Sequence, residues 1–536
     1  MSMFRVYIRR ATTKSPVWDW AQTVSAKTDG DALNRAYQSW VESKPNPAAP
    51  ALSACQTQVN PIKEKAYALD DAMQPAQPAQ PAQQAYMQVL QSKVAAALSS
   101  EPLDGEFELV NAPQGFNYGI TYGPNAYYNP ATCTTLDSLL SISSNGNLQL
   151  MNQGFSTLYG QVLQDVVFQF SKADNQTMVN QDNAASAQIA SILTEFTNAG
   201  GSYSNPLPLG GKLQDVFNQL NKQYGDVSQL PTTLNALRNA IASYQEMAGA
   251  SYALHNRYYL ATARLTAAQA NVTKPGAANG GMQVDPTNYV AGYTPAHLPS
   301  ANQLIGGLAT TTNAVNVTVS LSNFTSNSTQ MSVSGNSGLT ISIGELLDWS
   351  INGSATYNMS RYISSGSSVN MSFNYPGITP VPATPSALSL DNSTGWFDTE
   401  ILSEVVANSG RDATGYALQG SEFSVDELFG VGKVLSRLKT FVICQAPTIT
   451  MVFTQANNSL LTSDLTVNAS IEMDLFGLFS VGSASSSYQV QDVQQDSQAG
   501  TVTVTLGPPE VSGTIPLQQQ VAYVLGGVPS YPPSAP

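Results

Sequence analysis

The chain has 536 residues, enough for three or four domains of ordinary size, but only 11 % of them are charged, against about 25 % in an average soluble domain. Asparagine, serine, glutamine and threonine replace the charges, so we expect a neutral polar surface that packs against other proteins or against glycans. The net charge of −14, with no basic cluster to neutralise phosphates, argues against nucleic acid and anionic lipid as partners.

The first 43 residues are predicted to form a small ββα module. Phe4, Val6 and Ile8 alternate with polar residues, as in a half-buried strand, and residues 17–28 supply a second strand. A helix with an apolar face follows. At this size the module is small for a core of its own.

The opening sequence, MSMFRVYIRR, has arginines but no apolar segment after them, so it does not have the pattern of a secretory signal. No run of about 18 apolar residues occurs, which argues against a transmembrane helix. The expected location is therefore the cytoplasm, from which lysis or signal-less export could release the protein. Membrane contact is expected only after a conformational change.

Residues 44–84 are predicted to be a linker rich in proline, alanine and glutamine. The triplet Gln-Pro-Ala repeats in tandem from Gln74, and proline at this spacing favours an extended polyproline II spacer. A folded head on such a tether is a layout for docking. An ordinary spacer between two domains is the simpler interpretation and the one we favour.

Residues 85–275 are predicted to form a mainly helical domain. Apolar residues recur there at helical spacing, and the pattern favours packing as a helical bundle. Four apolar helical faces are predicted, over residues 155–170, 189–196, 213–224 and 231–262. The last one is predicted to be a single long helix that begins at Pro231. His255 lies in register with the last apolar face, so we expect a hydrogen-bonded core residue rather than a catalyst.

A loop rich in tyrosine, glycine and asparagine interrupts this helical region. Its tyrosines, Tyr118, Tyr122, Tyr127 and Tyr128, are the candidate binding residues of the chain, because flat rings among small polar residues are typical of adaptable binding surfaces. The alternative, which we favour, is that these rings cover the edge of the helical core.

The remaining chain is predicted to comprise a loop-rich connector over residues 276–312, a β-rich domain with inserted short helices over residues 313–528, and a flexible tail over residues 529–536. Residues of alternating polarity, such as those from Val315 to Leu321, indicate antiparallel sheets with one buried face, arranged like a β-sandwich. Alternating runs on either side of Gly335-Asn-Ser-Gly338 predict a hairpin.

Groups able to perform catalysis are scarce. His255 and His297 are the only histidines, and no Gly-x-Ser-x-Gly motif accompanies them. Gly432-Lys433 is followed by Val434 where a phosphate-binding loop needs serine or threonine, so this segment is predicted to be helical. The carboxylate pairs, Glu106 with Glu108 and Glu472 with Asp474, are each expected to share one strand face, and the second pair is expected to face solvent.

Three cysteines, Cys55, Cys133 and Cys444, lie far apart in the chain. They form neither a disulfide framework nor the paired spacing of a zinc site. The sequence therefore predicts no catalytic residue, no cofactor and no metal site, and the chain is not expected to be an enzyme.

These patterns predict an α+β multidomain protein that acts by non-catalytic binding or self-assembly, with itself, another protein or a glycan surface as partner, and with a homo-oligomer as one expected form. The first alternative is a pore-forming, membrane-damaging protein, because Val315 to Phe324 has about the 9–11 residues of a spanning strand. The second alternative is a carboxylate-based hydrolase.

Overall fold

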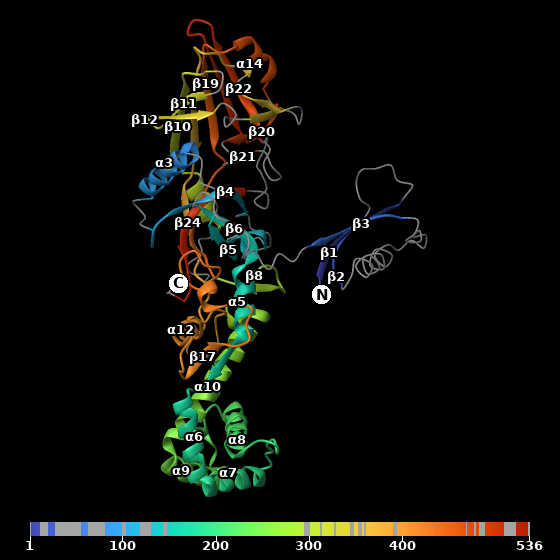
Figure 1. Cartoon of the computed structure of the whole chain (residues 1–536), viewed down its shortest axis with the longest axis vertical. Coiled ribbons are helices and arrows are strands. Elements are labelled where there is room, and N and C mark those ends of the chain that lie inside the picture. The colour runs from blue at the N-terminus through green and yellow to red at the C-terminus, as the bar shows by residue number, and fades with distance from the viewer. Residues whose placement is uncertain are drawn as a thin grey trace. The chain divides into compact units, whose positions relative to one another are not determined.

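The computed structural model describes residues 2–10, 20–26, 55–62, 81–98, 103–117, 130–142, 147–293, 301–310, 313–325, 328–342, 348–351, 356–358, 361–389, 394–467, 469–475, 479–481, 488–508 and 521–533. Helices and antiparallel sheets are both present, which confirms the expected α+β class (Figure 1). The chain divides into two compact units, Met1–Pro75 and Ala76–Pro536.

The first unit contains a three-stranded antiparallel sheet in the order β2-β1-β3. Strands β1 (Ser2–Arg10) and β2 (Trp20–Ala26) confirm the two predicted strands. Strand β3 (Cys55–Ile62) was missed, because it lies inside the stretch predicted to be a linker. It contains Pro61, which an edge strand tolerates. The predicted helix and residues 63–80 lie outside the described residues. The predicted linker ends too late, because helix α3 (Pro81–Ala97) begins inside it, within the third Gln-Pro-Ala repeat.

The second unit contains an eleven-stranded antiparallel sheet. Its order is β12-β11-β10-β15-β19-β23-β22-β20-β13-β14, and β21 pairs with β20. Its strands are β10 (Val315–Ser322), β11 (Ser328–Val333), β12 (Asn336–Ser342), β13 (Asp348–Ile351), β14 (Thr356–Asn358), β15 (Ser368–Tyr375), β19 (Thr448–Thr454), β20 (Ser470–Leu475), β21 (Phe479–Val481), β22 (Tyr488–Asp496) and β23 (Thr501–Gly507).

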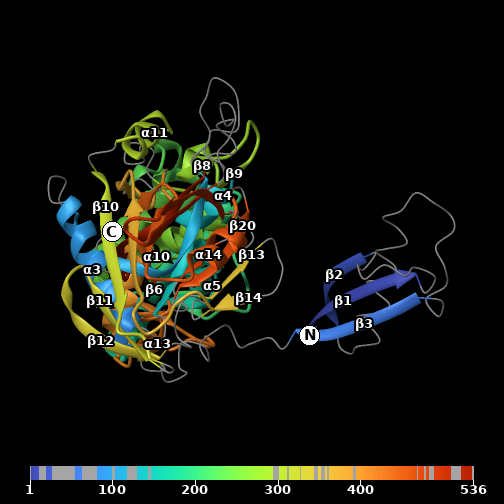
Figure 2. The same cartoon turned by 90° about the horizontal axis from the view of Figure 1, so that it is seen from above.

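The alternation along these strands buries one face of the sheet. In β10, Val315, Val317, Val319 and Leu321 are buried, whereas the residues between them are exposed or half-buried. Helix α3 (Pro81–Ala97) packs on this buried face against β10, β11 and β12 (Figure 2). The hairpin predicted around Gly335 is confirmed by the pairing of β11 with β12.

A six-stranded sheet joins distant parts of the sequence. Its order is β16-β18-β24-β4-β6-β5, and β4 is antiparallel to β24. Its strands are β4 (Glu108–Asn117), β5 (Ser138–Ile142), β6 (Leu148–Gly154), β16 (Thr379–Pro382), β18 (Arg437–Cys444) and β24 (Val521–Ser530). The predicted division at residues 276–312 therefore does not separate two compact units. Likewise, the tail predicted from residue 529 begins inside β24, where Ser530 pairs with Arg437.

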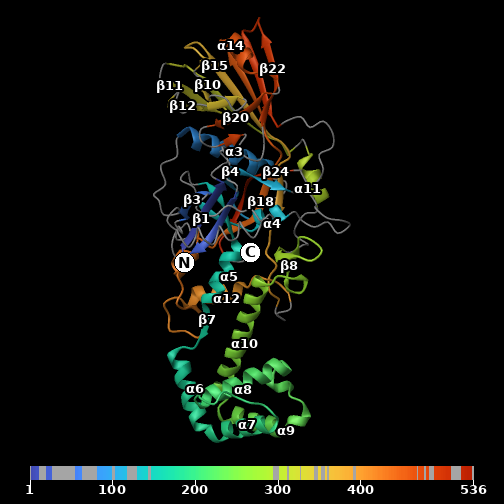
Figure 3. The same cartoon turned by 90° about the vertical axis from the view of Figure 1, so that its right-hand side faces the viewer.

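The helices of the second unit gather mainly between residues 155 and 273. They are α5 (Phe155–Asp165), α6 (Lys172–Ala184), α7 (Ser186–Asn198), α8 (Leu209–Tyr224), α9 (Asn235–Met247) and α10 (Gly249–Thr273). Helix α10 contacts α6, α8 and α9, and it also contacts α5 and β7 (Val166–Gln169) (Figure 3). It therefore connects the helical cluster to the rest of the unit.

Two predictions in this region are wrong in detail. The face predicted from Phe155 to Phe170 is a helix, α5, followed by strand β7, which pairs with β17 (Gly415–Leu418). The β-branched residues Val166 and Val167 favour that change of structure. The long helix predicted from Pro231 is two helices, α9 and α10, which are separated at Ala248.

The shorter elements complete the second unit. They are α4 (Pro130–Leu136), α11 (Ala301–Leu308), α12 (Thr399–Asn408), α13 (Val425–Leu428), α14 (Asn458–Asp464), three single-turn 3-10 helices (Val227–Gln229, Thr232–Leu234 and Ala277–Asn279), and the pair β8 (Gly281–Gln283) and β9 (Tyr289–Ala291). The segment from Phe429 to Ser436, predicted to be helical, is a turn-rich loop. Gly430 and Gly432 have φ values of 119° and 73° there, which a helix does not accommodate.

Candidate functional site

A pocket of about 620 Å³ lies among α6, α8, α10 and the loop before α8. Its apolar lining includes Phe170, Met178, Val179, Leu207, Pro208, Leu209 and Tyr258, and its polar lining includes Asn175, Asp182, Asn183, Ser204, Gln214, Asp215, Asn218 and His255. None of the described lining residues is lysine or arginine. The pocket therefore offers apolar surface, amides and carboxylates, and its one basic side chain is His255.

The rim of the pocket exposes apolar side chains to solvent. Val179 is 54 % exposed and Leu207 is 37 % exposed. The rings of Phe170 and Tyr258 stack in the wall, with their centroids 5.7 Å apart. Large apolar side chains at the mouth of a concave site are typical of ligand-binding pockets.

The carboxylate of Asp182 is the centre of the polar wall. Its Oδ1 accepts hydrogen bonds from the hydroxyl groups of Tyr244, at 2.6 Å, and Ser251, at 2.5 Å. Its Oδ2 lies 3.0 Å from Nε2 of His255. Burial raises the pKa of Asp182, but the hydrogen bonds from His255, Ser251 and Tyr244 outweigh it and leave the pKa below its ordinary value.

His255 has a partner at each ring nitrogen. The amide Nε2 of Gln214 donates to the backbone carbonyl of His255 at 3.2 Å, so the Oε1 of that amide faces Nδ1 of the ring, at 2.6 Å. Oxygen Oε1 can only accept, and Nδ1 therefore donates to it. With Nε2 held by Asp182, neither nitrogen is available to take a proton from a nucleophile.

The arrangement differs from a catalytic triad. Ser251 donates its hydroxyl to Asp182, not to His255. A triad needs the serine on one ring nitrogen and the acid on the other. His255 is buried, as expected for a hydrogen-bonded core residue, but it also lines a pocket, which the sequence did not indicate.

A glycine in α8 allows this close packing. A β-carbon at Gly210 would lie 2.8 Å from Oδ2 of Asp182, closer than a β-carbon approaches an oxygen. Only glycine therefore lets the first turn of α8 lie against the Asp182–His255 pair. Neither Asp182 nor Gln214 was singled out from the sequence. The signal that could have found them is that a histidine on an apolar face needs polar partners.

The predicted binding tyrosines, Tyr118, Tyr122, Tyr127 and Tyr128, lie outside the described residues, as does His297. The binding loop therefore stays a prediction.

Glu106 and Glu108 do not line a common pocket among those described. Glu106 lines a separate hollow of about 510 Å³ beside α3, and Glu108 is not among the residues that line it. Partial burial and the neighbouring Glu106 raise the pKa of Glu108. The side chains of Glu472 and Asp474 lie outside the described set.

Cys55 begins strand β3, and the other two cysteines, Cys133 and Cys444, are buried. Burial raises the pKa of the Cys133 and Cys444 thiols to about 12 each. Both thiols are therefore protonated at neutral pH and are unsuited to nucleophilic attack.

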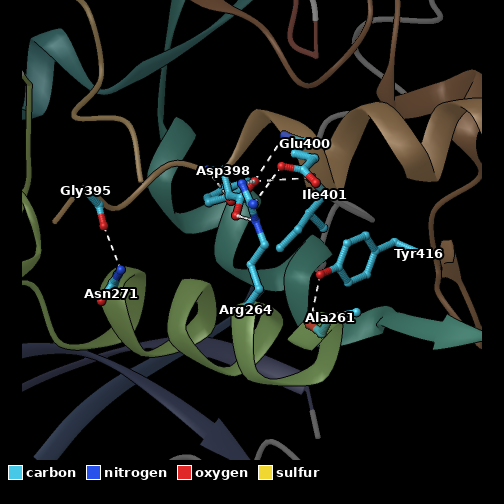
Figure 4. A network of polar contacts seen from close by, with 9 residues as sticks. Ala261, Arg264, Asn271, Gly395, Asp398, Glu400, Ile401 and Tyr416 are labelled. Atoms are coloured by element: carbon cyan, nitrogen blue, oxygen red, sulfur yellow. Dashed lines mark hydrogen bonds and ion pairs between the residues drawn. The ribbon is translucent and has the colours of Figure 1, made fainter. Parts of the chain in front are cut away.

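Polar contacts tie α10 to the chain around α12 (Figure 4). The amide Nδ2 of Asn271 donates to the carbonyl of Gly395 at 2.7 Å, and the hydroxyl of Tyr416 donates to the carbonyl of Ala261 at 2.8 Å. These bonds hold the helix that carries His255 in a fixed place.

Within the described ranges, no group of three or more histidine, cysteine, aspartate or glutamate residues is placed to hold a metal ion. No helix in the described part of the chain has both the length and the apolar character needed to cross a membrane. No family model, curated protein or solved structure matches this chain.

Proposed function

We propose that the protein is a non-catalytic binding protein that also assembles with itself, with the pocket among α6, α8 and α10 as its ligand site. The observation that carries this proposal is the hydrogen bonding of the pocket wall. Asp182 and His255 are fully engaged with each other and with Tyr244, Ser251 and Gln214. A pocket that is already formed, and whose titratable groups are engaged, favours binding over proton transfer.

The chemistry of the lining favours an uncharged or cationic amphipathic ligand. Amides and carboxylates pair with hydroxyl and amine groups, and the exposed apolar rim takes an apolar group. The carboxylates of Asp182 and Asp215 disfavour binding of an anionic ligand, because they would repel its charge. A glycan end has the required hydroxyl groups, in keeping with the glycan partner expected from the neutral polar surface. We propose in addition that the helices pack as a bundle and that the sheets are arranged like a β-sandwich.

A pair of fluorescent probes tests the site. We expect the neutral probe N-phenyl-1-naphthylamine to gain fluorescence with the protein and the anionic 8-anilinonaphthalene-1-sulfonate to gain much less. The substitution Leu207→Trp fills the mouth of the pocket and lowers neutral-probe binding. The matched control, Met247→Trp, adds the same ring at a residue that is 54 % exposed and does not line the pocket.

Equal binding of the neutral probe by the Leu207→Trp and Met247→Trp proteins would place the probe elsewhere and overturn the site. Self-assembly is tested separately, by light scattering across a range of protein concentrations. A strict monomer would remove the assembly half of the proposal and leave the ligand site untouched.

A further inference from the structure

The two ends of the eleven-stranded sheet differ in how they are protected. At one end, the hairpin β11–β12 contains no charged residue and no proline from Ser328 to Ser342. At the other end, β14 is three residues long, and Asp348 in β13 is paired in register with Asp474 in β20. Short strands, charges and prolines keep exposed strand edges from pairing with other chains. Strand β12 has none of these.

A groove runs beside the unprotected edge. A hollow of about 560 Å³ lies between α3 and the strands β11 and β12. Its lining is mostly apolar, with Ala85 and Val89 from α3, Met331 and Val333 from β11, and Leu339 from β12; Gln88, Ser92, Lys93 and Ser334 complete it. Among the described residues, β12 pairs only with β11.

A helix that lies beside an open strand edge is the geometry in which an added strand is bound. The backbone of the incoming strand completes the hydrogen bonds of the edge, and its alternate side chains enter the groove under the helix. We propose that β12 of a second copy of this chain is that strand, so that two copies pair antiparallel through β12 and form a two-fold dimer. This inference rests on the self-assembly part of the proposed function.

The charge pattern favours a second copy as the occupant. Because β12 carries no charge, antiparallel pairing with itself brings no like charges opposite each other. Lys93 is the single charged residue in the groove lining, so the groove offers little to a highly charged partner. Pairing of β12 with β14 of another copy would use a strand of only three residues. Pairing of β12 with itself uses seven residues and closes at two copies.

A charge placed on the edge tests the inference. Thr340 lies in β12 and is exposed, so Thr340→Lys adds a charge to the edge without entering the core. The matched control, Asn370→Lys, adds the same charge to an exposed residue of β15, which lies between β10 and β19. Sedimentation equilibrium measures dimer dissociation, and far-UV circular dichroism verifies that both variants are folded.

We expect Thr340→Lys to weaken the dimer at least roughly tenfold and Asn370→Lys to leave it unchanged. In the wild-type protein, amide hydrogen exchange over Asn336–Ser342 should slow as the protein concentration rises, which tests the edge without any substitution. A wild-type dimer that keeps its affinity in Thr340→Lys, or that loses it equally in Asn370→Lys, overturns the β12 interface but not self-assembly. A wild-type monomer at every concentration overturns both.

Discussion

Arg264 of α10 forms a bidentate ion pair with Asp398, the residue that caps the N-terminus of α12. Nε of the arginine lies 2.5 Å from Oδ2 and Nη2 lies 2.9 Å from Oδ1 (Figure 4). Asp398 is buried and also accepts hydrogen bonds from the backbone N–H groups of Glu400 and Ile401. One carboxylate therefore both starts a helix and fixes that helix to α10.

We expect Arg264→Ala to lower the free energy of unfolding by about 3 kcal/mol, because it leaves the buried Asp398 charge without its cation. Urea unfolding at neutral pH measures the loss. Glu400 provides the control, since it also contacts Arg264, at 2.6 Å, but is 57 % exposed in its side chain. Glu400→Gln should cost less than about 1 kcal/mol. Equal losses in the two variants would show that the buried carboxylate does not depend on Arg264.

The strands of the large sheet could be predicted because burial of one face imposes a period of two residues. In β15, Val369, Met371, Phe373 and Tyr375 are buried, and the alternation is visible in the sequence. Strand β7 could not be predicted in this way. Its residues continue the apolar spacing of α5, and what makes it a strand is pairing with β17, about 250 positions further along the chain.

Only part of the candidate site, the residue His255, could be predicted from the sequence. The position of His255 on an apolar face predicts burial and a hydrogen-bond partner, and both are present. Asp182 and Gln214 lie on two other helices, α6 and α8, and only tertiary packing brings them to His255. A local pattern contains no information on which helices pack together.

Asp182 should make the helical region sensitive to acid. Its pKa in the folded protein lies below the ordinary value of 3.8, so its contribution to stability is present above that value and is lost as pH falls through the lowered pKa. We expect Asp182→Asn to lower the free energy of unfolding at pH 7 by about 1–3 kcal/mol, since three donors lose their charged acceptor. The difference from wild type should shrink at acid pH. Urea unfolding at pH 7 and pH 3 measures it, and a difference independent of pH would contradict the assigned role.

Asp137 should have the opposite effect on the pH dependence of stability: it should destabilise the folded protein as pH rises. Burial raises its pKa to about 6, and two hydrogen bonds from Ser156, at 3.1 and 2.6 Å, only partly oppose this. The folded state thus binds the proton more tightly than the unfolded state, and stability is lost as pH rises from about 4 through about 6. The shift corresponds to about 3 kcal/mol.

Asp137→Asn removes this titration and keeps an oxygen that accepts from Ser156. We therefore expect the wild-type protein to lose stability relative to Asp137→Asn between pH 4 and pH 7. Urea unfolding of both proteins across that range isolates the contribution of Asp137, because other titrating groups are common to both. A constant difference would mean that Asp137 is ionised in the folded protein throughout.

Arg437 is a buried arginine that, unlike Arg264, has no bidentate carboxylate partner in the described part of the chain. It is fully buried, and its Nη1 donates to the carbonyls of Ala383 and Leu438, but Nε and Nη2 have no hydrogen-bond partner among the described residues. Its guanidinium lies 5.8 Å from the centre of the Phe155 ring, and burial lowers its pKa to about 10. This cation therefore loses its hydration without the bidentate carboxylate that compensates Arg264.

A buried cation that is poorly compensated costs stability, so replacing it by an apolar side chain of similar length should be tolerated. We expect Arg437→Met to change the free energy of unfolding by less than about 1 kcal/mol or to raise it, because the gain from removing the desolvated charge offsets the carbonyl of Ala383 left unpaired. Urea unfolding of Arg437→Met and Arg264→Ala under the same conditions compares the two changes in the free energy of unfolding. A loss as large as that of Arg264→Ala would show that Nε and Nη2 are paired in the folded protein, since only a compensated cation is costly to remove.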